Sequence, residues 1–179
     1  MVRSLLEDRF KLVIHPETRQ LPIYALVLSR PGKIGPQLTQ HSAKAKCTDS
    51  AAGLAPPPPG PGEATPAYCG GFFMIPKPGD LREAGNEITM DMLGAQLSRS
   101  LDRMAVDHTG LSGVFDFNIE FAPELGPGSQ PAADASASDP SAPPSIFTAL
   151  QEQLGLKLIP QTGPVDVLVI DHVEEPMPN

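Results

Sequence analysis

The sequence predicts an α+β protein in which a mainly antiparallel sheet carries helices on one face. The first observation is a strict alternation in "VFDFNIEF", where Phe115, Phe117, Ile119 and Phe121 are separated by polar residues. This period is typical of a strand with one buried face. The second observation is that amphipathic segments with helix start signals precede strand-like segments three times. The pattern indicates repeated helix–β-hairpin units, interrupted by two Pro-rich loops.

Each predicted helix has a local signal at one of its ends. Ser4 and Glu7 have the spacing of a capping box, which predicts a helix start at Ser4. Thr89 and Ser145 are suitable N-caps for the second and third helices. Gly155 follows the third amphipathic stripe and is placed to end that helix in a left-handed conformation.

Turn-like triplets divide the strand regions into predicted hairpins. They are "PET" at 16–18, "HTG" at 108–110 and "QTG" at 161–163. A further hairpin is expected over 71–89, with "KPGD" as its turn. The segments 23–28 and 165–173 have apolar residues on both faces, which predicts that both are central strands.

The chain is expected to form one α+β domain over residues 1–179, with long Pro-rich loops at about 31–70 and 122–144. Proline accounts for 22 of the 179 residues, against a typical share of about 5%. The loops are poor in large apolar residues, so they cannot bury enough surface to offset the entropy of ordering. Because a helix-like pattern begins almost at Met1, we also expect the chain to be truncated at its N-terminus.

The formal net charge of −8 argues against nucleic acid as a partner, because phosphates require Lys and Arg. No apolar run reaches the roughly 18–20 residues of a membrane span, so direct membrane insertion is not expected. The remaining partner classes are an unknown protein, a small-molecule ligand, or a second copy bound through an exposed strand edge.

Two Asp-His dipeptides are the weak catalytic candidates: Asp107–His108 and Asp171–His172. Successive strand residues point to opposite faces, so Asp171 and His172 cannot form a dyad with each other within a regular strand. A composite pair such as Asp107 with His172 would require the second and third units to lie side by side. The four histidines lack metal-ligand spacing, and we expect no metal and no cofactor. The favoured interpretation is that these residues are structural.

Cys47 and Cys69 are the two cysteines and they flank a Pro-rich loop. We expect a disulfide between them, which would indicate an oxidising compartment. Two free thiols are the alternative.

Three long phrases resemble a known protein family. They are "LLEDRFKLVIHPETRQLPIYALVLSRPG", "AVDHTGLSGVFDFNIEFAPE" and "SIFTALQEQLGLKLIPQTGPVDVLVIDHVEEP". The chain is similar to the C-terminal portion of a soil-associated bacterial family of uncharacterised proteins, whose domain also occurs fused to BlaR-type sensor metallopeptidases. The resemblance implies that the full-length parent protein is extracytoplasmic, which means either periplasmic or secreted. It assigns no functional residues.

The sequence therefore favours an extracytoplasmic, non-catalytic binding or interaction module. One alternative is a hydrolase-like enzyme that uses the Asp and His residues. Another is a sensor or regulatory domain that acts with an envelope metallopeptidase.

Overall fold

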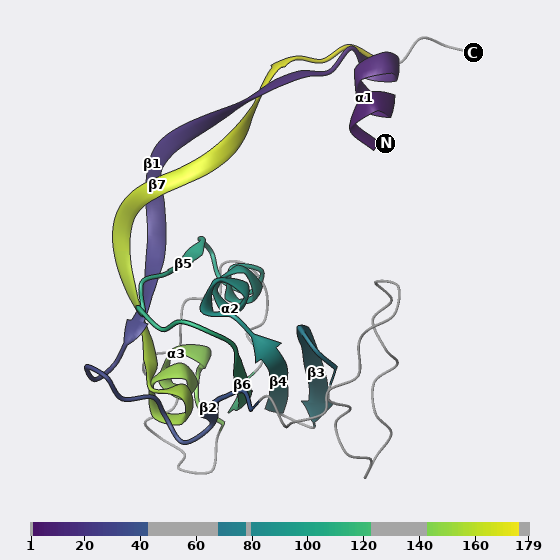
Figure 1. Ribbon diagram of the computed structural model, residues 1–179. Coiled ribbons are helices and arrows are strands. Elements are labelled where there is room, and N and C mark those ends of the chain that lie inside the picture. Colours follow the sequence, from purple (N-terminus) through teal and green to yellow (C-terminus); the bar gives the residue numbers. More distant parts are fainter. Residues whose placement is uncertain (1, 43–67, 78–79, 123–142, 176–179) are drawn as a thin grey trace. The chain divides into compact units, whose positions relative to one another are not determined.

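The computed structural model describes residues 2–42, 68–77, 80–122 and 143–175 (Figure 1). The chain divides into two compact units. Unit 1 comprises Met1–Ile23 and Gln161–Asn179, and unit 2 comprises Tyr24–Pro160. The expected single domain over 1–179 stays a prediction. The elements in chain order are α1 (Val2–Phe10), β1 (Val13–Leu28), β2 (Leu38–Gln40), β3 (Gly71–Lys77), β4 (Asp80–Ile88), α2 (Met90–Leu97), β5 (Ala105–Asp107), β6 (Phe115–Phe121), α3 (Ile146–Ala149), the π-helical segment η3 (Leu150–Leu154) and β7 (Leu156–His172).

Unit 1 contains α1 and a two-stranded ribbon, which we define as residues 13–23 of β1 and 161–172 of β7. The two strands are antiparallel, because Thr18 contacts Asp166 while the earlier His15 contacts the later Asp171. The predicted turns at 16–18 and 161–163 are wrong, since each triplet lies inside a continuous strand. Cross-strand pairing overrides both turn signals.

Unit 2 contains an antiparallel sheet in the order β2-β6-β4-β3. Its β3–β4 hairpin confirms the hairpin predicted over 71–89, with Lys77 paired to Asp80. The alternation in β6 is also confirmed, because Phe115, Phe117, Ile119 and Phe121 are all buried in the core. Residues of α2, α3 and η3 belong to the same core cluster, so the helical segments cover this apolar face.

The second sheet has the order β5-β1-β7, and β1 pairs with β5 in parallel from Tyr24 to Leu26. The α+β class is confirmed, but the strands form two sheets rather than one. The predicted central position is confirmed for 23–28, which belongs to β1. It is wrong for 165–173, because β7 is at the edge of its sheet. The apolar residues on both faces of β7 therefore do not mean that both of its faces are buried.

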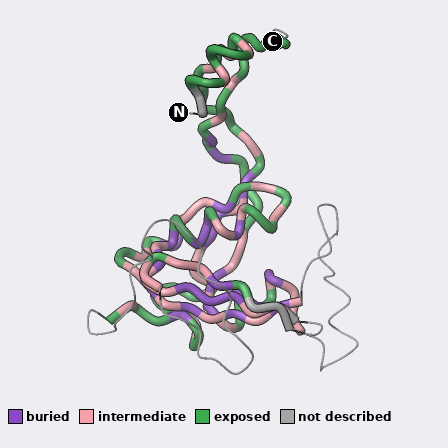
Figure 2. The backbone as a smooth tube through the Cα atoms, turned by 90° about the vertical axis from the view of Figure 1, so that its right-hand side faces the viewer, coloured by how far each residue is buried: buried purple, intermediate pink, exposed green. Residues whose placement is uncertain are grey.

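The helix signals are confirmed at α2 and at the α3–η3 segment. Thr89 accepts a hydrogen bond from the Met92 backbone N–H, and Ser145 accepts one from the Thr148 backbone N–H. Gly155 ends η3 with a φ of 69°, in the left-handed region. The predicted start at Ser4 is wrong, because α1 begins at Val2 and Ser4 lies inside it. Figure 2 shows buried residues along the elements of unit 2 and mostly exposed residues along α1 and the ribbon.

Candidate functional site

Asp107 and His108 form a turn at the end of β5. The Asp107 Oδ1 atom accepts a hydrogen bond from the Thr109 backbone N–H at 2.8 Å. The Thr109 hydroxyl oxygen in turn accepts one from the Leu111 backbone N–H at 3.1 Å. The His108 side chain is exposed, while its backbone N–H donates to the Leu26 carbonyl. The dipeptide therefore stabilises a turn and anchors it to β1.

Asp171 and His172 lie in the ribbon and have separate partners. Asp171 Oδ2 lies 2.7 Å from Nδ1 of His15, and His172 Nε2 lies 2.8 Å from Oε1 of Glu174. The side chains of His15 and Asp171 are 51% and 40% exposed. An acid–base pair this open to water lacks the desolvation that usually strengthens such a pair in an active site.

The structure does not bring the four Asp/His candidates together within one unit. Asp107 and His108 belong to unit 2, whereas Asp171 and His172 belong to unit 1. Within the described ranges, no group of three or more His, Cys, Asp or Glu residues is arranged to hold a metal ion.

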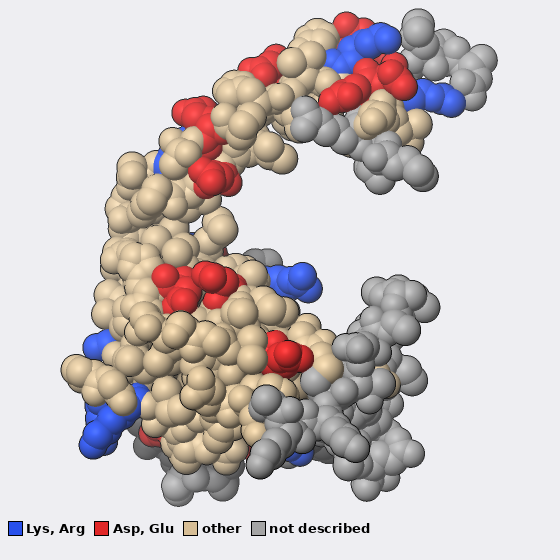
Figure 3. All heavy atoms as spheres, in the orientation of Figure 1, with Lys and Arg blue, Asp and Glu red and all other residues tan. Residues whose placement is uncertain are grey.

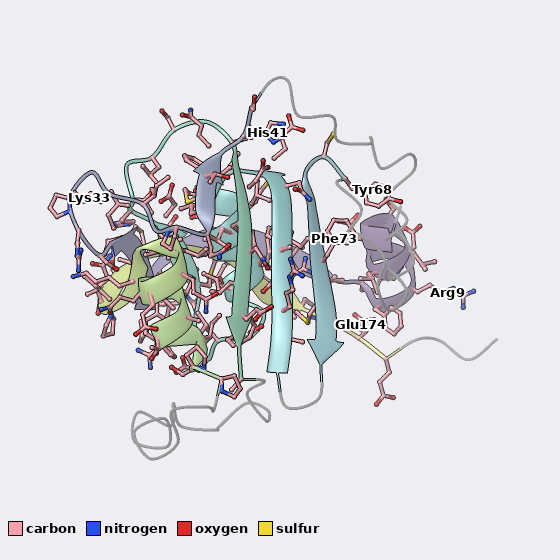
Figure 4. The ribbon with its side chains drawn as sticks, turned by 90° about the horizontal axis from the view of Figure 1, so that it is seen from below. Arg9, Lys33, His41, Tyr68, Phe73 and Glu174 are labelled. Atoms are coloured by element: carbon pink, nitrogen blue, oxygen red, sulfur yellow. The ribbon has the colours of Figure 1, made fainter. Side chains whose placement is uncertain are left out.

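A histidine–carboxylate pair that the sequence did not predict lies in unit 2. His41 Nδ1 is 2.8 Å from Asp116 Oδ1, and the His41 side chain is only 9% exposed. The same oxygen accepts a hydrogen bond from the Glu87 backbone N–H, at a bulge where Glu87 has a positive φ of 56°. Figure 4 shows His41 just beyond the end of β2. Asp116 thus connects three neighbouring strands. Since 75 residues separate it from His41, no local pattern could reveal the contact.

Glu83 is a buried carboxyl group in β4. It is 5% exposed and accepts a hydrogen bond of 2.8 Å from the Gln96 side-chain amide of α2. Burial raises the pKa of Glu83, and the Gln96 hydrogen bond acts in the opposite direction. No local pattern predicted this burial, because Glu83 follows Arg82 in a polar stretch.

Among the described residues of unit 1, the most exposed apolar side chains lie on the ribbon. Leu168 is 68% exposed and Ile170 is 62% exposed. Thr18 and Asp166 are in contact across the strands, so the alternation of side chains places even-numbered residues of both strands on one face. We give the name Leu168 face to the part of this surface formed by Ile14, Pro16, Thr18, Asp166, Leu168 and Ile170. The remaining even-numbered residues of the ribbon are Gln20, Pro22, Thr162, Pro164 and His172.

The opposite face of the ribbon is mixed, because Val165, Val167 and Val169 share it with charged side chains. It carries the His15–Asp171 pair and an ion pair between Arg19 and Glu17, with 2.7 Å between Arg19 Nη2 and Glu17 Oε2. Both faces of the ribbon therefore carry apolar side chains, and Leu168 and Ile170 are the ones that remain largely in contact with solvent. Exposed apolar clusters of this kind are typical of interaction sites. Figure 3 shows that charged side chains on the visible surface form small, separated groups of both signs.

The expected disulfide cannot be followed in the structure. Cys69 is described, but Cys47 lies outside the described residues, so the bond between them stays a prediction.

A protein family described as "Protein of unknown function (DUF3738)" matches residues 1–173 of this chain. No curated protein and no solved structure is similar enough to count as a match. Among the described residues, no helix has the length and apolar character needed to cross a membrane.

Proposed function

Because the chain belongs to the DUF3738 family, whose function is unknown, we propose that it is a non-catalytic protein-binding module with the Leu168 face as its contact surface. The observation that carries the proposal is the exposure of Leu168 and Ile170 on one face of the ribbon. Burying a large aliphatic side chain contributes roughly 1.5–3 kcal/mol, so covering these two residues would supply a substantial part of a binding energy.

The Asp and His candidates favour binding over hydrolysis. Asp107 is engaged with the backbone of its own turn. The His15–Asp171 pair is open to solvent and lies on the face of the ribbon opposite the Leu168 face. These contacts stabilise a turn and the strand pairing. A structural role of this kind is what we expect of Asp and His residues in a non-catalytic module.

The proposed binding can be tested by immobilising the chain and identifying proteins of other masses retained from an envelope extract of its host. The double variant Leu168→Ser/Ile170→Ser should lose a protein that the wild type retains. Met104→Ser is the matched control, because Met104 is 48% exposed but lies in unit 2. Retention that is unchanged in the double variant would contradict the assignment of the Leu168 face.

We also propose that the module works outside the cytoplasm, where Cys47 and Cys69 would be bonded. Closing a loop of this size by a disulfide could add about 3 kcal/mol to stability in the chain-entropy model. Mass spectrometry of non-reduced peptides from protein secreted to an oxidising compartment should find one linked peptide containing both residues. Two free thiols would contradict the bond and weaken the inference of an oxidising compartment.

A further inference from the structure

We propose that the outer edge of β7 binds an extended, basic segment of another protein, which adds to the sheet as a further strand. This inference rests on the proposed function, since it states how a partner of the Leu168 face is held and what its chemistry is. The edge concerned is residues 166–172, which lie wholly in unit 1.

Backbone hydrogen bonds show which residues face outward. The Tyr24 N–H donates to the Met104 carbonyl on the β5 side, so even-numbered residues of β1 direct their backbone groups away from β7. The odd-numbered Ser29, just after β1, donates instead to the carbonyl of Gly155, just before β7. Because backbone groups alternate in direction along a strand, odd-numbered residues of β7 face β1 and even-numbered residues face outward.

The prolines of the two strands agree with this direction. Pro16 and Pro22 of β1 and Pro160 and Pro164 of β7 are all even-numbered. Proline has no N–H, so it is tolerated at a sheet edge where its nitrogen points away from the neighbouring strand. These four positions therefore cost the pairing of β1 with β7 no hydrogen bond, and they protect parts of both outer edges against strand addition.

Beyond Pro164 the outer edge of β7 is open. Asp166, Leu168, Ile170 and His172 each direct an N–H and a carbonyl outward, and no described strand pairs with them. An extended segment can hydrogen-bond to such a row of groups, which is how sheet edges recruit peptides. The backbone thus selects an extended chain as the partner.

The side chains of this stretch are those of a central strand. Val167 and Val169 are partly buried on one face, while Leu168 and Ile170 are exposed on the other. Apolar residues on both faces are typical of a strand inside a sheet, but β7 lies at the edge. A further strand beside β7 would remove this mismatch, because its side chains would pack next to both apolar pairs.

The two ends of the open edge are acidic. Asp166 lies at one end, and its carboxylate accepts a hydrogen bond from the neutral Thr18 hydroxyl. Glu174 and Glu175 follow the other end, where Glu174 contacts His172. Lys or Arg residues on either side of an apolar segment would gain favourable charge contacts here. A second copy would bring the same acids and a formal net charge of −8, which opposes its binding.

Amide hydrogen exchange of the whole chain, followed by NMR, tests the edge with a capped probe peptide, Lys-Val-Thr-Val-Thr-Val-Lys. The probe should bind with a Kd of roughly 10 μM to 1 mM. At saturation it should slow exchange at the outward amides of Asp166, Leu168, Ile170 and His172 by about tenfold or more. The inward amides of Val167 and Val169 pair with β1 and should change less.

Two control peptides separate the charge of the probe from its backbone. Replacing both Lys residues of the probe by Glu, or its central Val by Pro, should weaken binding by roughly fivefold or more. Because NaCl screens charge contacts, it should weaken binding of the Lys probe.

Proline substitutions in the protein distinguish the edge from the face. Leu168→Pro removes an outward N–H but no bond to β1, and it should weaken probe binding by roughly fivefold or more. Gln20→Pro is the matched control, because it removes an outward N–H from the opposite edge of the ribbon and should leave binding unchanged. Pro164→Val supplies an outward N–H and should strengthen binding. Circular dichroism of each variant verifies that the fold is intact.

Unchanged exchange at the outward amides, or equal binding of the probe and both control peptides, would overturn the proposal. Protection that grows with the concentration of the chain alone would assign the edge to a second copy and overturn the basic partner. If Leu168→Pro retains the envelope protein that Leu168→Ser/Ile170→Ser loses, strand addition is refuted and the Leu168 face remains the contact surface. If the edge binds the probe but the double variant retains every envelope protein, the proposed function alone is refuted.

Discussion

Asp116 Oδ1 accepts a hydrogen bond from the backbone N–H of Glu87 at 2.9 Å, and the same atom lies 2.8 Å from His41 Nδ1. A residue with positive φ is strained unless its surroundings hold it in place. This carboxylate therefore has two functions at once: it holds the bulge of β4 and it orients a nearly buried imidazole at the end of β2.

Asp116→Ala should lower the free energy of unfolding by roughly 1.5–3 kcal/mol, because a hydrogen-bonded charged group is removed. His41→Ala should have a smaller effect, since it leaves the contact with Glu87 in place. In a double-mutant cycle followed by urea denaturation, the two substitutions should be non-additive. Additive effects would show that the two side chains contribute independently.

Gly35→Ala should destabilise unit 2 by roughly 2 kcal/mol or more, because overpacking against rigid backbone is destabilising. A Cβ atom at Gly35 would meet the Gln153 carbonyl and the backbone of Leu154 and Gly155. Gly71→Ala is the matched control, because its nearest contact would be an ordinary 3.4 Å to Tyr68 Cβ. Thermal unfolding that responds equally to both substitutions would contradict this packing.

Glu83→Gln should stabilise the protein at neutral pH, because the amide is neutral and avoids the cost of burying a carboxylate. The pKa of Glu83 is raised above its usual 4.5 by burial. The favourable contribution of its neutral form is therefore complete below the unfolded pKa, and it is lost as the pH rises through the folded pKa. Chemical denaturation from pH 4 to pH 8 should show a growing advantage for the variant. Glu175→Gln, at an exposed position, should show none, and equal behaviour of the two variants would refute the burial effect.

Asp107→Ala should cost about 1 kcal/mol of stability, because it removes the acceptor of the Thr109 backbone N–H. His108→Ala should change the unfolding free energy by less than about 0.5 kcal/mol, as is usual for an exposed side chain. Guanidinium denaturation of the two variants distinguishes them. The reverse order would indicate a role for His108 beyond the turn.

Features determined by neighbouring residues could be predicted from the sequence, and contacts between distant residues could not. The Thr89 and Ser145 caps and the left-handed Gly155 depend on the chain within four residues, and all three are confirmed. The alternation of β6 is confirmed for the same reason.

Apart from the helix start at Ser4, which lies inside α1, the failed predictions involve long-range pairing. "PET" and "QTG" have good turn chemistry, yet the pairing of β1 with β7 holds both triplets in extended strands. Gly163 of the "QTG" triplet leaves space for the Ile23 side chain of β1, because a Cβ atom at position 163 would collide with it. The His41–Asp116 pair and the burial of Glu83 likewise depend on strands brought together from distant segments.

The pairing of β1 with β7 also determines when this protein can finish folding. Thr18 and Asp166 are 148 positions apart, so the ribbon closes a loop that contains nearly all the rest of the chain. A ribosome adds roughly 5–20 residues per second, so β1 must wait many seconds after its own synthesis before its partner strand is available. During that interval the N-terminal strand is a nascent-chain segment without its native neighbour, and contacts of such high sequence separation form slowly even afterwards. Ribbon formation should therefore come late, after β7 has been synthesised.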